Sequence, residues 1–366
     1  MKLTISKDEI QGKLSNIQNI VEKRNTMPVL SHFLLDAGKK AAYIVATDLQ
    51  IAIKEPLEAN VQSEGKLCVP ARKLFEIVRE AEGDITIESE DEQWIKVSFG
   101  RSRFRLACLP PAEFPAWPGV ESAEEVKFGI DALSEMIEKT IYAAGETDTR
   151  YTLNGLLFHM KAGEEGITVV GTDGHRLALL VKNLGVKVAE EKKVIVPRKA
   201  AAELRRFFGG PEEISAVIGK NHLLFKIGEI QFLVRLIEGT YPNYEQVVPP
   251  SNEKKVTIGR EDLLRTLRRV SVMSRERSNA VRVDISEGSL AVSSSNPDIG
   301  EARDEVSADY NGEDVSLGFN ARYLMDALGA MSTERVIFSL QDALSPTLLQ
   351  EEGKEDYRCV VMPMRI

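Results

Sequence analysis

The chain repeats one pattern three times, and this repetition constrains its fold more than any short motif does. An extended stub leads into a helical apolar pattern in CVPARKLFEIVRE from Cys68, in IVPRKAAAELRRF from Ile195 and in GFNARYLMDALGAM from Gly318. Two further segments recur in the same order, at spacings of about 125 residues. Repeated units of this kind favour a closed ring or an arc over a single catalytic cleft. The sequence therefore predicts three copies of one domain.

Each copy is predicted to be a small α+β unit. Apolar residues at helical spacing, such as Ile10, Leu14 and Ile17, alternate along the chain with strand patterns such as LSHFLLDAG. We expect two helices on one side of antiparallel strands in every copy. The predicted helices span residues 7–24, 71–82, 129–144, 198–208, 260–275 and 320–331. The predicted domains span residues 1–122, 126–248 and 254–366.

Composition excludes several classes of protein. Apolar residues make up 43% of the 366 and charged residues 28%, as in ordinary globular proteins. No apolar run reaches the roughly 18 residues of a membrane span, and the first residues lack the layout of a secretion signal, so we expect a cytoplasmic protein. The three cysteines are far apart, and we expect buried thiols. With four scattered histidines, the sequence predicts no metal site and no cofactor.

Charge is distributed unevenly along the chain. The net charge is −9, but the six predicted helices hold 18 basic and 13 acidic residues, which leaves 29 basic and 43 acidic residues elsewhere. If the helices share one side of an assembly, that side would suit a phosphate backbone that is contacted without sequence reading. The alternative is a set of solvated helix faces with ordinary ion pairs.

No catalytic constellation is present in the sequence. Phosphate-binding loops, a nucleophile elbow and a zinc-protease helix are all missing. Asp173 and His175 in GTDGHRLALL could pass for a base and its orienting group, but the first copy has Asp48 at the same place and no histidine. We therefore predict aspartates that order a tight turn, and His175 and Arg176 become candidates for binding. Two other readings stay open, a metal-dependent nuclease and a DNA-independent scaffold oligomer.

Four strings in family order, TDGHRLA, VPRK, GTYPNY and the final VVMPMRI, resemble the bacterial DNA sliding clamps, the β subunits of DNA polymerase III. The resemblance covers the whole chain. It implies a non-catalytic processivity factor: a head-to-tail homodimer whose six domains form a ring, with helices lining the hole. Such a ring encircles duplex DNA. It tethers the replicative polymerase, the clamp loader, other polymerases and repair proteins through short linear peptides.

The resemblance also implies DNA contacts by helix and loop residues. Phosphate contacts on helices would leave a nearly flat energy along the duplex, which sliding requires. The chain departs from the family pattern at Thr147 and Thr152, where a glutamine and an aromatic residue are expected. The predicted DNA-binding residues are Arg24, Arg72, Thr147, Tyr151, Thr152, Arg198 and Lys199.

A dimer interface is implied at each end of the chain. GRSRFRLACLP places arginines on one face of a strand and Phe104 with Leu106 on the other, a pattern that an isolated edge strand could also use against aggregation. In the family this strand pairs with the third domain of a second copy. The predicted interface residues are Arg103, Phe104, Arg105, Leu106, Val272, Met273, Glu301, Asp304 and Glu305.

A peptide-binding cleft between the second and third domains is the last implication. The first two copies continue beyond their final strand, whereas the third stops at VVMPMRI, so we expect a free apolar tail rich in methionine; Val360 could instead pack in its own core. Gln246 and Pro346 replace an expected arginine and serine. The predicted cleft residues are Leu153, Thr172, Gly174, His175, Arg176, Leu177, Pro242, Val247, Asn320, Tyr323, Val360, Met362, Pro363, Met364 and Arg365.

Overall fold

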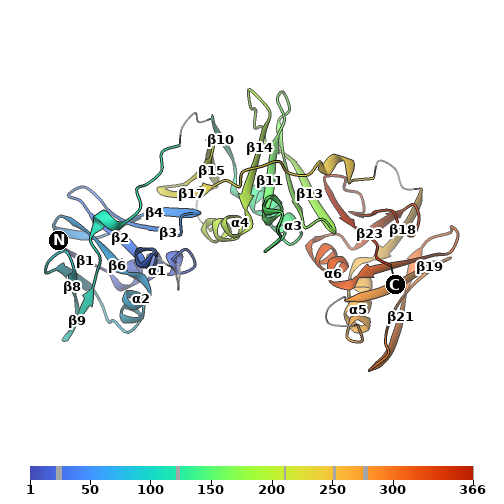
Figure 1. Cartoon of the computed structure of the whole chain (residues 1–366), viewed down its shortest axis with the longest axis horizontal. Helices are drawn as coiled ribbons and strands as arrows, with labels where there is room; N and C mark the ends of the chain where they lie inside the picture. Colours follow the sequence, from blue (N-terminus) through green and yellow to red (C-terminus); the bar gives the residue numbers. More distant parts are fainter. Residues whose placement is uncertain (22–26, 121–123, 210–211, 250–252, 275–278, 366) are drawn as a thin grey trace. The chain divides into compact units, whose positions relative to one another are not determined.

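The computed structural model describes residues 1–21, 27–120, 124–209, 212–249, 253–274 and 279–365. By their contacts these residues group into two compact units. Figure 1 shows their helices and strands, coloured along the sequence. The first unit combines residues 1–131 with 199–236, and the second combines 132–198 with 237–366. Each unit has its own sheets and its own buried core, and each is described by itself.

The first unit opens with an antiparallel sheet in the order β5-β1-β7-β8-β9. Helices α1 (Lys7–Ile17) and α2 (Ala71–Arg79) pack against each other beside it. The Ser6 side chain caps α1 by accepting a hydrogen bond from the Glu9 amide, which satisfies one of the free N–H groups of the first turn. The strands are β1 (Lys2–Ile5), β5 (Asn60–Ser63), β7 (Ile85–Ser89), β8 (Trp94–Phe99) and β9 (Ser102–Ala107).

A second sheet of the first unit runs in the order β10-β15-β16-β17-β4-β3-β2-β6. It joins four strands of the first copy to four of the second, and β4 and β17 form the seam between them. The seam pairs run from Ile51 opposite Val234 to Lys54 opposite Gln231. The strands are β2 (His32–Ala37), β3 (Ala42–Thr47), β4 (Ile51–Leu57), β6 (Gly65–Pro70), β10 (Glu124–Gly129), β15 (Glu213–Ile218), β16 (His222–Ile227) and β17 (Ile230–Arg235).

The second unit has one continuous sheet in the order β14-β11-β12-β13-β25-β24-β23-β18-β21-β20-β19-β22. Its seam lies between β13 and β25, with Arg176 opposite Val361 and Leu180 opposite Tyr357. The strands are β11 (Gly155–Met160), β12 (Gly166–Thr172), β13 (Arg176–Asn183), β14 (Lys192–Pro197), β18 (Lys254–Gly259), β19 (Ala280–Ser286), β20 (Ser289–Asn296), β21 (Gly300–Asp309), β22 (Val315–Asn320), β23 (Arg335–Leu340), β24 (Thr347–Glu351) and β25 (Tyr357–Val361).

The same strand order occurs at both seams. The first seam reads β6-β2-β3-β4 followed by β17-β16-β15-β10, and the second reads β14-β11-β12-β13 followed by β25-β24-β23-β18. Each strand at the first seam has a counterpart at the same position of the second seam, and the counterparts also follow one another in the same order along the chain. The predicted triplication and the α+β class are therefore confirmed. The exact domain boundaries stay predictions, because the compact units follow the continuous sheets and divide the second copy between them.

All six predicted helical segments contain a helix, and each helix starts within one residue of its predicted start. The helices end earlier than predicted. Where the structure describes the final residues of the predicted segments, these form turns, irregular backbone or short 3-10 segments such as η4 (Arg205–Phe207). Helices α5 and α6 pack against each other, and α5 also covers β20 and β21. The remaining helices are α3 (Ile130–Ile141), α4 (Arg198–Leu204), α5 (Arg260–Ser271) and α6 (Ala321–Ala330).

Cys68, Cys108 and Cys359 are buried free thiols, as predicted. Burial raises the pKa of Cys68 and of Cys108 to about 12 and that of Cys359 to about 11, so all three stay protonated at neutral pH. Among the described residues, no helix has the length and apolar character needed to cross a bilayer. The described part of the chain also holds no group of three or more His, Cys, Asp or Glu residues placed to bind a metal.

Candidate functional site

The second unit carries a pocket of about 330 Å³ at the seam between β13 and β25, which is called the large cleft below. Its floor is apolar, because Leu177 and Val360 are buried partners across the seam. Its rim is polar and basic. The residues that line it are Arg150, Leu153, Thr172, Gly174, His175, Arg176, Leu177, Pro242, Tyr244, Gln246, Val247, Pro346, Val360 and Met362. An apolar hollow with a few oriented polar groups is the usual form of a ligand site.

A tight turn between β12 and β13 positions the rim of the large cleft. The Asp173 carboxylate accepts hydrogen bonds from the amides of His175 (2.9 Å) and Arg176 (3.0 Å). Asp48 does the same for the amides of Gln50 (2.9 Å) and Ile51 (2.7 Å). The prediction that these aspartates order turns is confirmed. Because their oxygens are occupied in this way, the proposed nuclease role for them loses its main support.

Arg176 is held on three sides. Its guanidinium donates to Asp173 (3.1 Å), to Asp326 on α6 (2.5 Å) and to the main-chain oxygen of Tyr142 (2.6 Å). The same group lies 4.5 Å from the centre of the Tyr323 ring, within cation–π distance. The prediction that Arg176 binds a ligand stays untested, but the residue lines the cleft and its guanidinium is held in place by these bonds.

Arg150 also lines the large cleft and contacts the turn between β12 and β13. Its guanidinium makes two hydrogen bonds with the Asp148 carboxylate, at 3.0 and 2.7 Å, and a third with the main-chain oxygen of Asp173 at 3.0 Å. Hydrogen bonds from the side chain and amide of Arg150 lower the pKa of Asp148 to about 2, so the pair remains ionised at neutral pH. The guanidinium packs directly over Gly174, where an added Cβ would lie 2.7 Å from a terminal nitrogen.

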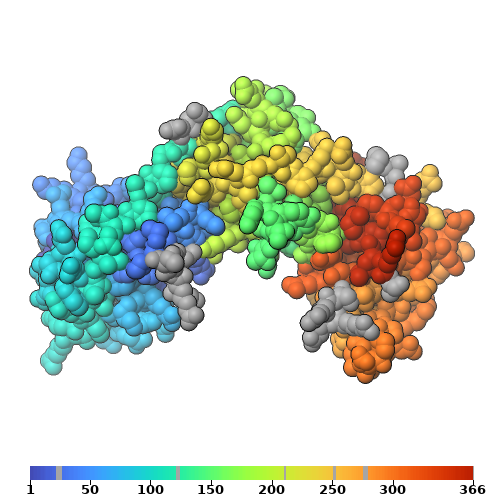
Figure 2. All heavy atoms as spheres, in the orientation of Figure 1, coloured from blue at the N-terminus to red at the C-terminus, as the bar shows by residue number. Residues whose placement is uncertain are grey.

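The C-terminal residues form part of the wall, and the expectation of a free tail is wrong. The Met362 amide donates to the His175 main-chain oxygen (2.9 Å), and the Met364 amide donates to that of Gly318 (2.8 Å). These bonds hold the segment beyond β25 against two strands. Val360 is buried, as the alternative reading allowed, but it also lines the cleft. Figure 2 shows atoms of the C-terminal part of the chain, coloured red, on the face that is drawn.

Tyr244 closes the side of the cleft and rests on a buried histidine. His159 Nδ1 lies 2.8 Å from the Tyr244 hydroxyl, and its Nε2 donates to the Glu191 carboxylate at 2.7 Å. Tyr241, from the same segment, donates to the main-chain oxygen of Val170 (3.2 Å). These buried hydrogen bonds fix the wall before any ligand arrives.

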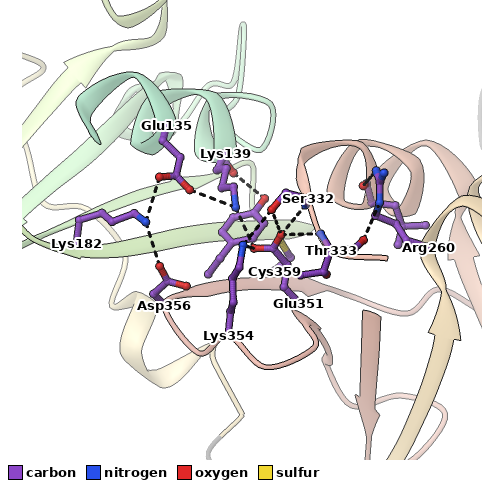
Figure 3. Close-up of polar contacts among 12 residues, drawn as sticks. Glu135, Lys139, Lys182, Arg260, Ser332, Thr333, Glu351, Lys354, Asp356 and Cys359 are labelled. Atoms are coloured by element: carbon purple, nitrogen blue, oxygen red, sulfur yellow. Dashed lines mark hydrogen bonds and ion pairs between the residues drawn. The ribbon is translucent and has the colours of Figure 1, made fainter. Parts of the chain in front are cut away.

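A buried polar network fastens the helix α3 to the third copy behind the cleft (Figure 3). Glu351 is almost fully buried at the end of β24 and lies 2.9 Å from the Lys139 ammonium. Its other oxygen accepts a hydrogen bond from the Ser332 hydroxyl (2.6 Å). Burial alone would raise the pKa of Glu351, but the hydrogen bonds from Ser332 and Lys139 prevail and lower it to about 2. The buried carboxylate is therefore charged and paired.

The network reaches the cleft through two tyrosines. The Tyr357 hydroxyl donates to the Lys139 main-chain oxygen (2.8 Å) and lies 3.1 Å from the Tyr142 hydroxyl. Tyr142 in turn gives its main-chain oxygen to Arg176. Hydrogen bonds through Lys139, Tyr357 and Tyr142 thus connect the buried Glu351 carboxylate with Arg176 at the rim of the large cleft.

Ten of the predicted cleft residues line the pocket. Asn320 instead caps α6 by accepting from the Arg322 amide (2.9 Å), and the Tyr323 ring stacks on that of His175 at 6.5 Å. Pro363, Met364 and Arg365 follow in the bonded segment beyond Met362 and are not among the lining residues. Sequence reasoning missed Arg150 and Tyr244. Tyr244 lay in the quoted GTYPNY string, whereas Arg150 lay in a loop that was assigned to DNA.

The predicted DNA contacts belong to both units: Arg72 and Lys199 to the first, and Thr147, Tyr151, Thr152 and Arg198 to the second. Arg24 lies outside the described residues. Arg72 is exposed and bonds to Glu76 (3.2 Å), as the reading of solvated helix faces expects. Arg198 pairs with Glu146 (2.7 Å), while Lys199 pairs with Asp48. In the second loop, the Tyr151 side chain is 77% exposed, Thr147 is exposed and Thr152 is half-buried.

The predicted interface residues lie on two strand edges and on the end of α5. Arg105 bonds to Glu90 (2.7 Å) and covers the Trp94 ring, and Asp304 bonds to Arg269 (2.7 Å), so both already have partners. Phe104 is 36% exposed and Val272 is 75% exposed. Leu106 differs from the expected apolar contact face, because it is buried in its own sheet. Arg103, Glu301 and Glu305 are exposed, and Met273 is half-buried.

Comparison with known proteins supplies the family. Models of the N-terminal, central and C-terminal domains of the DNA polymerase III beta subunit match residues 1–118, 128–243 and 245–365. The chain belongs to the DNA polymerase III beta subunit family. It is 36% identical to the beta sliding clamp of Pseudomonas putida and 33% identical to that of Escherichia coli K12, over the full length of both chains in each case. Members of this family are non-catalytic processivity subunits of DNA replication.

Solved structures agree with this family assignment. The sliding clamp of Pseudomonas aeruginosa aligns over the whole of both chains with a TM-score of 0.92 and 34% identity. That of Bartonella birtlesii, solved bound to griselimycin, aligns over the same extent with a TM-score of 0.96 and 32% identity. The comparisons support neither the nuclease nor the scaffold reading.

Proposed function

We propose that two copies of this chain close into a ring around duplex DNA by forming a third seam like the two already present. The observation that carries this proposal is strand order. β22-β19-β20-β21 matches the first half of each seam, and β9-β8-β7-β1 matches the second half. Among the described strands, β9 has a neighbour only on one side, and β21 meets β18 only through Ala308 and Asp309. Each edge is suited to the other in a second copy.

Charge and apolar surface support the same pairing. The exposed Arg103 lies on β9, and the exposed Glu301 and Glu305 lie on β21. Opposite charges on facing edges favour one register and one partner. Phe104 on β9 and Val272 after α5 offer the apolar contact. Two such seams related by a two-fold axis give a closed head-to-tail dimer, which no longer presents these edges.

The proposed DNA contacts use basic residues that already have weak partners. The ion pair of Arg72 with Glu76 is on an exposed helix surface, where such pairs contribute about 0–1 kcal/mol. A phosphate can replace the exposed Glu76 carboxylate at little cost, and no base needs to be read. A ring of such contacts holds DNA topologically while it slides. We place this activity in the cytoplasm.

We propose that the large cleft binds short linear peptides of the replicative polymerase, the clamp loader, other polymerases and repair proteins. The fixed apolar floor accepts aliphatic or aromatic side chains, and methionine at the rim adapts to different ones. The rim arginines are held by carboxylates, so they orient a peptide without being free to collapse onto it.

The ring proposal is tested by size and by topology. The chain of 40.6 kDa is expected to sediment as a dimer of twice that mass. After loading by a clamp loader, it should stay on sealed circular DNA through gel filtration and leave when the circle is cut once. A monomer, or equal retention on sealed and cut DNA, would contradict the proposal.

Gly174→Val is expected to weaken peptide binding by at least tenfold. The backbone φ of Gly174 is +85°, and a Cβ there meets the guanidinium of Arg150, which Asp148 holds in place. The displaced arginine would enter the cleft. Fluorescence anisotropy with a labelled Gln-Leu-Ser-Leu-Phe peptide measures the loss. Gly163→Val, at a turn where an added Cβ meets no atom within 4 Å, is the matched control for the left-handed backbone, because its φ is +80°. Equal affinity in both variants would remove the cleft from this account.

A further inference from the structure

The first unit contains a second, smaller cleft that has the same backbone frame as the large cleft. It lies at the seam between β4 and β17, has a volume of about 70 Å³ and is called the small cleft below. Its walls come from the turn after β3, the end of β17 and a segment that follows η2 (Pro111–Glu113). The residues that line it are Val45, Thr47, Leu49, Gln50, Ile51, Ala52, Phe114, Pro115, Ala116, Trp117, Pro118, His222, Leu233 and Arg235.

The two turns match hydrogen bond for hydrogen bond. The Thr47 hydroxyl donates to the Ile51 main-chain oxygen (2.8 Å), as the Thr172 hydroxyl does to that of Arg176 (2.6 Å). The Leu49 amide donates to the Thr47 hydroxyl (3.0 Å), just as the Gly174 amide donates to that of Thr172 (3.1 Å). The small cleft is therefore a built site, organised before any ligand arrives.

The final strands match as well. The Arg235 amide donates to the Gln50 main-chain oxygen (2.8 Å), and the Met362 amide donates to that of His175 (2.9 Å). Arg235 thus occupies in the small cleft the place that Met362 occupies in the large one. The small cleft therefore has the cationic side chain of Arg235 at the position where the large cleft has the flexible apolar side chain of Met362.

Leu49 is the unusual residue of the small cleft. Its φ is +73°, a conformation that costs a residue other than glycine about 1 kcal/mol or more. Its side chain is nevertheless 47% exposed. Packing in the core of the first unit therefore does little to offset the cost of this backbone conformation, because about half of the Leu49 side chain is exposed. Leu49 lines the small cleft together with Phe114 and Trp117.

Size and charge specify the occupant. The volume of about 70 Å³, against about 330 Å³ for the large cleft, favours a single small side chain such as valine over a run of several residues. Arg235 is exposed, and within the described part of the chain no carboxylate forms an ion pair with it. His222 lies on the same wall. The cation therefore favours a carboxylate next to the apolar side chain.

We propose that the small cleft binds a peptide segment in which a small aliphatic residue is flanked by acidic residues. This site is additional to the large cleft. It rests on the proposed function in one respect: the large cleft, which has the same backbone hydrogen bonds, is proposed to bind peptides. A partner that carries both kinds of segment would contact both units of one chain, and so gain affinity through linkage.

Methyl NMR on the full-length protein tests the proposal. The probe is the peptide acetyl-Gly-Asp-Val-Asp-Gly-amide, and its matched control has lysine in place of both aspartates. Saturable shifts are expected at the methyl groups of Val45, Leu49 and Ile51 with the acidic probe, and not with the basic one. The same shifts should persist in Gly174→Val, which separates this site from the large cleft. Absence of these shifts up to about 1 mM peptide, equivalent to about −4 kcal/mol of binding, would overturn the proposal.

Two variants test the assigned groups. Arg235→Glu should weaken binding of the acidic probe at least tenfold, because it places like charges together. Leu49→Gly should weaken it severalfold while leaving the unfolding midpoint unchanged or higher, because glycine adopts the left-handed backbone without strain. Shifts confined to Val247 and Val360 of the large cleft, or unchanged affinity in Arg235→Glu, would also overturn the proposal.

Discussion

Phe104→Glu combined with Val272→Glu is expected to convert the dimer into monomers of 40.6 kDa and to abolish retention on sealed circular DNA. Both side chains are exposed in a single chain, 36% and 75% respectively, so neither change removes a buried core residue. At the proposed third seam, the two introduced glutamates would place carboxylates where the apolar side chains of Phe104 and Val272 are expected to be buried. The loss of such central contacts costs about 2 kcal/mol or more each, which weakens association by over a hundredfold in combination.

Sedimentation velocity across a concentration series measures the change, and gel filtration of loaded circles measures retention. Leu344→Glu is the control, because Leu344 is 64% exposed and lies on neither edge. It should remain dimeric and stay on DNA. Should the double variant sediment like the parent chain, the paired edges of β9 and β21 would not be the closing contact.

Glu351→Gln should lower stability by about 3–5 kcal/mol, the largest effect we expect from a single substitution. The change keeps the shape of the side chain but removes the charge that faces Lys139, which is itself 10% exposed. Lys139 would keep only its longer ion pair with the partly exposed Glu135 (3.4 Å), so the desolvation of its ammonium would no longer be fully offset. The midpoint of chemical unfolding, followed by circular dichroism, should fall clearly below that of the parent.

A double substitution separates the charge from the packing. Glu351→Leu with Lys139→Met should recover most of the loss, because an apolar pair of similar volume removes both buried charges. Glu352→Gln is the matched control at the neighbouring position. The ion pair of Glu352 with Arg335 is long, at 3.8 Å, and half-exposed, so a change within about 0.5 kcal/mol is expected. A loss in Glu352→Gln equal to that in Glu351→Gln would rule out the buried pair as its cause.

The stabilising effect of Glu351 should depend on pH in a defined window. Its folded-state pKa of about 2 lies below the ordinary value of 4.5. Stability from this group is therefore complete above about pH 5 and is lost as the pH falls toward 2. A difference of this size corresponds to about 3 kcal/mol. In Glu351→Gln this part of the acid dependence should be missing.

The sequence predicted the larger organisation well, because repetition is visible without coordinates. The starts of the helices followed from apolar spacing and from acidic first turns such as that of Asp8. Asp48 and Asp173 were assigned to turns because comparison of two copies showed which residues they share. Most of the large cleft could be assigned from strings that resemble the sliding clamps.

Other features depended on contacts between residues far apart in the chain. Leu106 alternates with arginines like an interface residue, but the sheet buries it. Asn320 was predicted as a cleft residue, a prediction that stays untested, and its side chain also caps α6, which the family strings did not indicate. The C-terminal tail seemed free because no strand follows it, yet Met364 bonds to Gly318. Sequence periodicity reports which face of an element is apolar, and it does not report which other element covers that face.

By itself, the sequence determined the threefold repeat, the α+β class and the family, because these depend on local patterns and their order. Only the tertiary structure decided that each seam joins the strands of successive copies into one sheet. Hydrogen-bond pairing across a seam depends on residues about 180 positions apart, such as Ile51 and Val234, and no local pattern encodes their register. That pairing also placed Arg235 and Leu49 in one cleft, where their chemistry becomes meaningful.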